Sequence, residues 1–323
     1  MAVYTEISDD DLTAFVADYG IGEVLSCKGI AEGVENSNFL LITEQNSFIL
    51  TLYEKRVDPK DLPFFLGLTQ HLSERGVPCP TPVHSKNGEV LRELSGRPAA
   101  LVTFLNGMWP KRIQNHHCAG LGQAMAHLHV QGADFELSRP NALSVSSWRP
   151  LLDACEGRGE EIQPGITAEL SAELDVLEAN WPTDLPAGVI HADLFPDNVF
   201  FRGENLSGLI DFYFACNDQY AFDLAICLNA WCFERHGDFN ATKARKMLRA
   251  YRKVRALSDA EMQALPLLAR GAAMRFLLTR MYDWLNTPDN AFVTPKDPLE
   301  YLKKLRFHQA VSGPGAYGLD YNL

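Results

Sequence analysis

The sequence has no stretch of about 18 uncharged apolar residues, the length needed to cross a bilayer. Its first residues, 1–11, are acidic and carry no apolar leader pattern. The seven cysteines are scattered, odd in number and without a C-x-x-C pair, which favours reduced thiols. A formal net charge of −12 disfavours a broad surface for nucleic acid or anionic membrane. We therefore expect a cytoplasmic chain without a membrane anchor or a nucleic-acid partner.

Several nucleotide and metal motifs are also missing. No Gly-x-x-x-x-Gly-Lys-Ser/Thr loop occurs, and the cluster His116, His117 and Cys118 lacks partners at metal-ligand spacing. Residues 313–318 match Gly-x-Gly-x-x-Gly, but no helix follows them to bind a pyrophosphate. We interpret this segment as a flexible tail. These absences argue against P-loop, dinucleotide-binding and metal-cluster proteins.

Hydrophobic residues at 46% and charged residues at 22% are typical of a globular chain, and 323 residues suffice for about two domains. The first third predicts a helix at 7–18, an antiparallel meander and a helix at 61–75, then two or three further strands. The expected strands of this region are 24–25, 38–42, 48–53, 83–84, 89–93 and 99–104. This pattern predicts a small lobe over residues 1–104.

The remaining chain, 105–323, has mostly helical spacing. The expected helices are 117–130, 167–180, 222–234, 241–254, 259–285 and 298–309. Residues 139–148 are predicted to be an irregular connector, and 188–212 to hold short strands between polar loops. The whole chain therefore predicts an α+β protein with two lobes, the second of them larger and mostly helical.

The residues that indicate chemistry lie in that non-helical region. Asp193 is followed by Asn198, and Asp211 comes thirteen positions later after an apolar run. Phosphoryl transfer to an alcohol requires an aligned hydroxyl, an acceptor for its proton and a cation that offsets phosphate charge. Asp193 suits the base or orienting role, and the oxygen atoms of Asn198 and Asp211 suit Mg²⁺.

With His191 two positions before Asp193, the pattern His-x-Asp-x-x-x-x-Asn resembles the aminoglycoside phosphotransferase and choline kinase branch of the protein-kinase-like superfamily. The resemblance implies a bilobal kinase that uses ATP and Mg²⁺. His191 is interpreted as a structural residue that ties the loop by hydrogen bonds. Asp223, in an expected helix start, is interpreted as a helix cap.

The resemblance also implies where the nucleotide binds. The loop at 29–38 is expected to cover the phosphates, and the strand leading to Thr103 and Leu105 resembles the hinge that pairs with adenine. The expected loop contacts are Gly33, Asn36, Ser37 and Asn38. Related kinases have a lysine or arginine on the third strand, where this chain has Thr51. Either Lys28, Lys55 or Arg56 substitutes for that residue, or phosphate binding relies on the loop and the metal. Asp61 is the nearest candidate for the carboxylate that would pair with such a cation.

From about residue 28 to residue 280, the motifs of this chain resemble those of the bacterial homoserine kinases built on this fold. Thr51 in place of the strand lysine is part of this resemblance. It implies phosphorylation of L-homoserine to O-phospho-L-homoserine, on the route to threonine. Arg275 and Arg280 are candidates for the substrate carboxylate, and Glu35 and Asp218 for its ammonium group. Choline, ethanolamine, methylthioribose and aminoglycosides remain alternative acceptors, and a non-catalytic nucleotide-binding scaffold remains an alternative class. The oligomeric state stays open.

Overall fold

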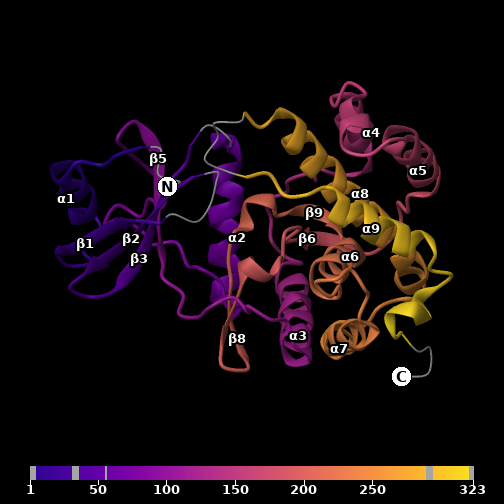
Figure 1. The fold of residues 1–323 in the computed structure, drawn as a ribbon. Helices are drawn as coiled ribbons and strands as arrows, with labels where there is room; N and C mark the ends of the chain where they lie inside the picture. Colours follow the sequence, from indigo (N-terminus) through magenta and orange to yellow (C-terminus); the bar gives the residue numbers. More distant parts are fainter. Residues whose placement is uncertain (1–4, 31–35, 55–56, 289–293, 320–323) are drawn as a thin grey trace. The chain divides into compact units, whose positions relative to one another are not determined.

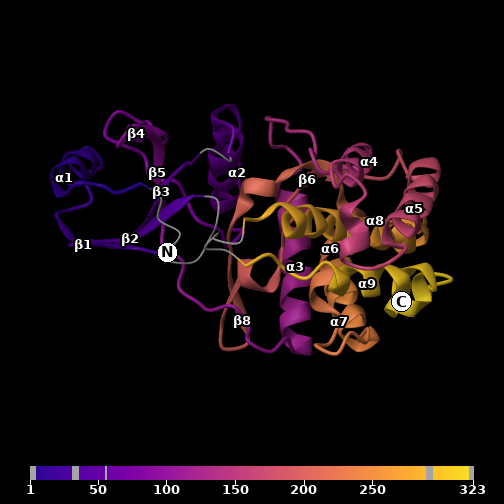
Figure 2. The ribbon, with the colours of Figure 1, turned by 45° about the horizontal axis from the view of Figure 1, so that its top comes forward.

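The computed structural model describes residues 5–30, 36–54, 57–288 and 294–319, and the chain divides into two compact units (Figures 1 and 2). Unit 1 comprises Met1–Gly107, Asp134–Arg139 and Ser207–Tyr213, and unit 2 comprises the rest. The predicted α+β class, with a small antiparallel sheet and a helical remainder, is confirmed. Two late segments join unit 1, which sequence order alone does not reveal. The functional lobes 1–104 and 105–323 stay a prediction.

Unit 1 is built on an antiparallel sheet with the order β1-β2-β3-β5-β4. Its strands are β1 (Val24–Gly29), β2 (Ser37–Thr43), β3 (Ser47–Leu52), β4 (Arg92–Leu94) and β5 (Arg97–Thr103). The expected strand at 83–84 is instead a single extended contact, in which Val83 N donates to Leu101 O at 2.8 Å. Its neighbour Pro82 makes only an isolated bridge to Val102, because proline has no N–H to continue a ladder.

Alternating side chains give the sheet one apolar face, because successive residues of a strand point to opposite sides. Phe39, Leu41 and Leu50 on that face are buried against α1 (Asp9–Ala17). Ser8 caps this helix by accepting from Asp11 N at 3.1 Å. The second helix, α2 (Leu62–Glu74), follows β3 as predicted, after a single turn of 3-10 helix at Pro59–Asp61.

Unit 2 is mostly helical, as the spacing predicts. Its helices are α3 (Asn115–Gln131), α4 (Val145–Asp153), α5 (Ile166–Asn180), α6 (Tyr220–Trp231), α7 (Ala241–Arg252), α8 (Asp259–Asn286) and α9 (Leu299–Gln309). The longest, α8, begins with a capping box in which Ser258 and Glu261 satisfy each other's backbone N–H groups. α6 is buried around nearly its whole circumference, as expected of a central helix. α3 and α7 pack closely (Figures 1 and 2).

Two short two-stranded sheets carry the non-helical region. β6 (Ala187–Ile190) pairs antiparallel with β9 (Cys216–Gln219), and β7 (Val199–Arg202) forms a sheet with β8 (Asn205–Leu209). The residues of β8 from Ser207 onward belong to unit 1. The polar loop 191–198 connects β6 to β7 and ends in a 3-10 turn at Pro196–Asn198. This arrangement fixes both ends of the loop that contains Asp193.

Two sequence expectations about unit 2 are wrong. The segment 139–148 includes the start of α4, whose Trp148 is fully buried and donates from Nε1 to Leu143 O at 2.9 Å. The expected flexible tail is folded: Tyr317 lies in a 3-10 turn at Pro314–Tyr317, is fully buried and contacts Nδ1 of His308 through its hydroxyl at 2.8 Å. In both segments a buried aromatic side chain orders a chain whose local pattern is weak.

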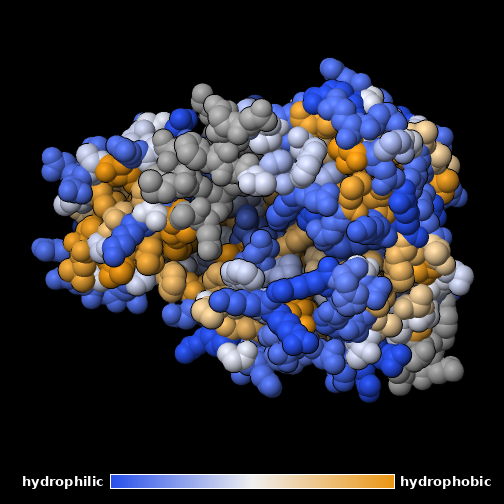
Figure 3. All heavy atoms as spheres, in the orientation of Figure 1, coloured by the Kyte–Doolittle hydropathy of each residue, from blue (hydrophilic) through white to orange (hydrophobic). Residues whose placement is uncertain are grey.

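Hydrophilic side chains cover much of the face of unit 2 seen in Figure 3, with hydrophobic residues scattered between them. Among the described residues, no helix combines the length and the hydrophobicity needed to span a membrane. All seven cysteines are free thiols, as predicted.

Candidate functional site

The loop 191–198 of unit 2 is held by hydrogen bonds around Asp193. The Asn198 amide nitrogen donates to the backbone oxygen of Asp193 at 2.8 Å and to its carboxylate Oδ2 at 3.1 Å. Phe195 N donates to the same backbone oxygen at 2.7 Å. Asp193 and Asn198 are both half-buried. Because Nδ2 of Asn198 makes these bonds, its amide oxygen is left as an acceptor or metal ligand.

His191 has the structural role predicted for it. Its ring is fully buried, and Nδ1 accepts from the backbone N–H of Asp193 at 3.3 Å. The acceptor is the His191 ring and the donor is the backbone of Asp193, two residues later. This hydrogen bond therefore closes a tight turn at the start of the loop.

Asp223 lies beneath the loop and does not cap a helix, so the expectation for it is wrong. The N-cap of α6 is Gln219, and Asp223 is 0% exposed inside the helix. Its carboxylate accepts from His191 N at 3.0 Å, from Ala192 N at 2.9 Å and from His129 Nε2 at 3.1 Å. Burial alone would raise the pKa of Asp223, but the hydrogen bonds from the His129 side chain and from the backbone of His191 hold this pKa below its ordinary value. The loop therefore rests on a buried anion.

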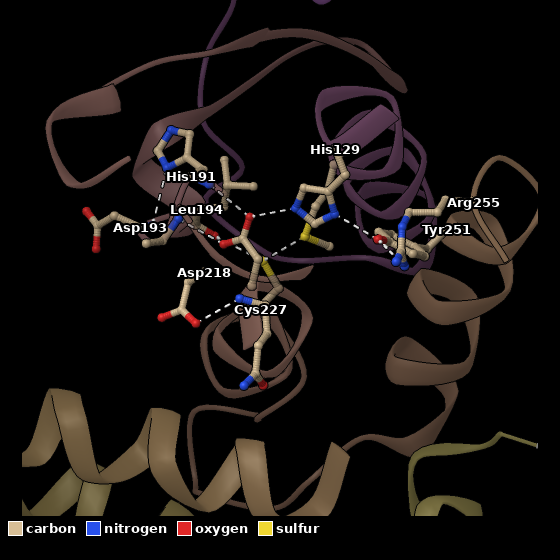
Figure 4. A network of polar contacts seen from close by, with 12 residues as sticks. His129, His191, Asp193, Leu194, Asp218, Cys227, Tyr251 and Arg255 are labelled. Atoms are coloured by element: carbon tan, nitrogen blue, oxygen red, sulfur yellow. Dashed lines mark hydrogen bonds and ion pairs between the residues drawn. The ribbon is translucent and has the colours of Figure 1, made fainter. Parts of the chain in front are cut away.

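A chain of polar contacts continues from Asp223 to α7 and α8. Figure 4 shows the part that runs from His129 to Tyr251 and Arg255. Nδ1 of His129 lies 2.7 Å from the Tyr251 hydroxyl, which accepts from Arg255 at 3.2 Å. Arg255 pairs with Glu261 at 2.8 Å. Burial lowers the pKa of His129, so its neutral ring donates from Nε2 to Asp223 and accepts from Tyr251 at Nδ1.

Of the four residues predicted to bind the substrate, the structure describes three. Arg275 is 1% exposed and donates to the backbone oxygen of Ala192 at 2.8 Å. Arg280 pairs with Glu300 at 2.7 Å. Asp218, on β9, accepts from Asn141 Nδ2 at 2.7 Å. Glu35 lies outside the described residues.

In unit 1, the side chains predicted to contact phosphate make hydrogen bonds that link β2, β3 and the residues next to these strands. Thr51 donates to Oδ1 of Asn38 at 2.8 Å, across the β2–β3 register. Ser37 donates to Glu54 Oε1 at 2.7 Å, and Oδ1 of Asn36 accepts from Glu54 N at 3.2 Å. Asn36, Ser37 and Thr51 are buried. Their part in nucleotide binding stays a prediction.

The other predicted nucleotide residues are less constrained by the structure. Gly33, Lys55 and Arg56 lie outside the described residues. Lys28 is exposed on β1, and Asp61 pairs with Arg139 at 2.6 Å. At the end of β5, Thr103 Oγ1 accepts from Thr81 N at 2.9 Å, and Leu105 follows it beyond the strand. Among the described residues, these contacts show no cation that would replace a strand lysine.

Asp211, in unit 1, is exposed and has a left-handed backbone with φ of 64°. Such a conformation is uncommon for residues other than glycine, and it occurs often at functional sites. Asp211 lines a cavity of about 50 Å³ together with eight other residues. They are Tyr53, Phe65, Leu66, Thr69, Pro80, Val102, Phe212 and Tyr213. Tyr213 makes edge contacts with Tyr53 and Phe65 at ring centroid distances of 5.7 and 5.6 Å.

Comparison with known proteins identifies the family of the chain. The family model described as "Phosphotransferase enzyme family" matches residues 26–257. The chain belongs to this family. The resemblance stated from the sequence is thereby confirmed.

Close relatives cover the full length of this phosphotransferase. A protein of Rhodospirillum rubrum named homoserine kinase is 67% identical over 319 residues, which are 99% of each chain. A homoserine kinase of Paramagnetospirillum magneticum is 63% identical and covers 99% of this chain and 100% of its own length.

Solved structures share the fold at low identity. An amicoumacin kinase in complex with AMP-PNP and Ca²⁺ has a TM-score of 0.71 at 14% identity, with 95% of each chain covered. A spectinomycin phosphotransferase in complex with ADP and spectinomycin has a TM-score of 0.66 at 13% identity, over 97% of this chain and 98% of its own. These likenesses support the kinase-like fold.

Proposed function

We propose that this phosphotransferase is a homoserine kinase. It transfers the γ-phosphoryl group of ATP to the side-chain hydroxyl of L-homoserine and yields ADP, O-phospho-L-homoserine and a proton. The observation that carries the proposal is the identity of 67% and 63% with two proteins of that name over essentially their whole lengths. The small-molecule acceptor follows from the same relatives.

Asp193 is the proposed base and orienting group for the acceptor hydroxyl. Its carboxylate is half-buried and held at Oδ2 by Asn198, which limits its rotation. A carboxylate in this role accepts the hydroxyl proton as the O–P bond forms, while the bond between the γ-phosphorus and the bridging oxygen of ADP breaks. The negative charge of the departing ADP is then the charge that the site must offset.

The donor atoms of two other residues fit Mg²⁺. The free amide oxygen of Asn198 and the exposed carboxylate of Asp211 are hard oxygen ligands, which Mg²⁺ prefers. We propose that these two residues hold the ion, which when bound offsets phosphate charge. Asn198 serves twice in this proposal, since its nitrogen orients Asp193 and its oxygen would be a ligand of the metal.

The nucleotide contacts proposed from the sequence are the loop containing Gly33, Asn36, Ser37 and Asn38, together with Thr51 and the backbone near Thr103 and Leu105. The buried side chains of this set support the loop, so its backbone N–H groups are the better candidates for phosphate contacts.

The function is tested by coupled ADP release with purified protein. The acceptors are L-homoserine, choline, ethanolamine, methylthioribose and an aminoglycoside, each at saturating Mg·ATP. We expect kcat/KM for homoserine to exceed every other value by at least about 100-fold, a discrimination within the reach of substrate pockets. Phosphorus NMR should identify a phosphomonoester. A better rate with another acceptor would overturn the substrate, and ATP binding without any acceptor turnover would favour a scaffold.

A further inference from the structure

Ala192, directly before the proposed base, has a strained backbone with φ of 62°. A left-handed conformation is unfavourable for a residue with a Cβ, so neighbouring contacts must impose it. The N–H of Ala192 donates to Asp223 Oδ1 at 2.9 Å, and its carbonyl oxygen accepts from Arg275 at 2.8 Å. Both peptide groups that flank Ala192 are therefore held, one by a buried anion and the other by a buried cation.

Arg275 is a costly residue at this position. It lies inside α8 with 1% of its surface exposed, and in the described part of the chain no carboxylate accepts a hydrogen bond from it. Its Nε has no hydrogen-bond partner there either. Burial lowers the pKa of Arg275, which the charges of Asp193 and Asp223 oppose. A methionine of similar length would fill this space without a desolvation cost, so stability alone does not explain an arginine.

The surroundings of the guanidinium fix its direction. The central carbon of the guanidinium, Cζ, lies 4.6 Å from the centre of the Phe276 ring and 5.7 Å from the centre of the Phe214 ring. Phe276 in turn makes an edge contact with Phe195 of the loop, at 4.9 Å between centroids. Aromatic faces attract a desolvated cation, so the side chain is held against the loop from α8.

We propose that Arg275 is a positioning residue for Asp193, which acts by clamping Ala192 in its left-handed conformation. The proposal rests on the proposed function, in which Asp193 faces the acceptor hydroxyl. It replaces the sequence-based hypothesis that Arg275 binds the substrate carboxylate. A guanidinium that is 1% exposed and already bonded to Ala192 is poorly placed to contact a ligand.

The test compares Arg275→Met and Arg275→Lys with a control on the same helix. Arg270→Met removes an arginine that pairs with Glu173 at 2.7 Å, so it perturbs α8 without touching the loop. We expect Arg275→Met to lower kcat about 100-fold, Arg275→Lys to recover about tenfold of that loss, and Arg270→Met to change kcat less than threefold. KM for ATP, and Kd for homoserine measured by calorimetry, should stay within threefold of wild type in all three.

A second variant tests the strain itself. Glycine adopts positive φ without the penalty of a Cβ, so Ala192→Gly should restore part of the activity when the clamp is lost. We expect the double variant Arg275→Met, Ala192→Gly to turn over at least about fivefold faster than Arg275→Met alone. This comparison needs only the ratio between two variants, so it stands even where both are less stable than wild type.

Three results overturn the positioning role. The first is an unchanged kcat in Arg275→Met, and the second is an increase of 30-fold or more in the Kd of Arg275→Met for homoserine. The third is a double variant Arg275→Met, Ala192→Gly that turns over no faster than Arg275→Met. The second result would restore Arg275 as a carboxylate ligand. Wild-type protein that fails to phosphorylate homoserine contradicts the proposed function instead. In that case the ratio of Arg275→Met to wild type, measured with the acceptor that the screen identifies, still decides the positioning role.

Discussion

Replacing Asp223 by asparagine should strongly lower the free energy of unfolding of unit 2, although the two side chains have nearly the same shape. The carboxylate accepts from two backbone N–H groups and from His129, at 2.9 to 3.1 Å. Asparagine has a single acceptor oxygen, so its NH₂ group must face at least one of these donors. The substitution therefore removes charge-assisted hydrogen bonds and leaves a buried donor unpaired.

The magnitude follows from those bonds. Each hydrogen bond to a charged group contributes about 1.5 to 3 kcal/mol, and breaking a buried charged network typically costs about 3 to 5 kcal/mol. We expect Asp223→Asn to lower the free energy of unfolding by about 3 to 5 kcal/mol. Asp175→Asn is the matched control, because Asp175 pairs with Arg149 but its side chain is 73% exposed. An exposed pair contributes less than about 1 kcal/mol.

The assay is urea unfolding followed by tryptophan fluorescence. All five tryptophans belong to unit 2, so the signal reports on the unit that contains Asp223. The folded pKa of Asp223 is depressed, so its stabilisation is present above the unfolded pKa and disappears as the pH falls through the folded value. The variant should therefore differ most from wild type near neutral pH. A loss at pH 7 no larger than that of the control would refute the reasoning.

Three further predictions concern single groups. Asp193→Asn should lower turnover by about three orders of magnitude, because an amide does not accept the hydroxyl proton. Calorimetry should find the ATP affinity of this variant nearly unchanged. A near-normal rate would exclude Asp193 as the base. Burial lowers the pKa of His308 to about 3, so between pH 7 and pH 5 this residue should cost about 2 kcal/mol of stability as the unfolded state takes up a proton. His308→Gln should remove that part of the slope in urea unfolding, and parallel curves would contradict it. Gly122→Ala would place a Cβ 2.2 Å from the backbone oxygen of Met247 and should cost at least about 3 kcal/mol. Gly313→Ala, which meets nothing within 4 Å, should stay within about 0.5 kcal/mol of wild type.

Local patterns in the sequence predict the regular elements well. The helix expected at 259–285 is found at Asp259–Asn286, because a capping box starts it and an apolar stripe continues it. The strand β9 was missed, since Cys216–Gln219 has a polar pattern and is extended mainly because it pairs with β6. α4 was missed for a related reason: tertiary burial of Trp148 outweighs a proline inside the helix.

The site shows the same division between local and long-range information. The spacing of His191, Asp193 and Asn198 predicts a catalytic loop because all three residues lie close together in the sequence, within the loop 191–198. The support from Asp223 and Arg275 comes from residues 31 and 83 positions away from Ala192. Such contacts depend on how helices pack, which one sequence does not reveal. A signal for them was nevertheless present, since an acid and an arginine in otherwise apolar helical segments are unusual.

The structure suggests why this phosphotransferase places two costly charges beside one loop. Asp223 and Arg275 are both fully buried, and together they fix the two peptide groups on either side of Ala192. Asn198 then fixes the next residue by bonding both the backbone and the carboxylate of Asp193. These contacts lie within unit 2 and involve no nucleotide. The proposed base and one proposed metal ligand are therefore oriented in advance, so binding energy is not consumed in ordering them when the substrates arrive.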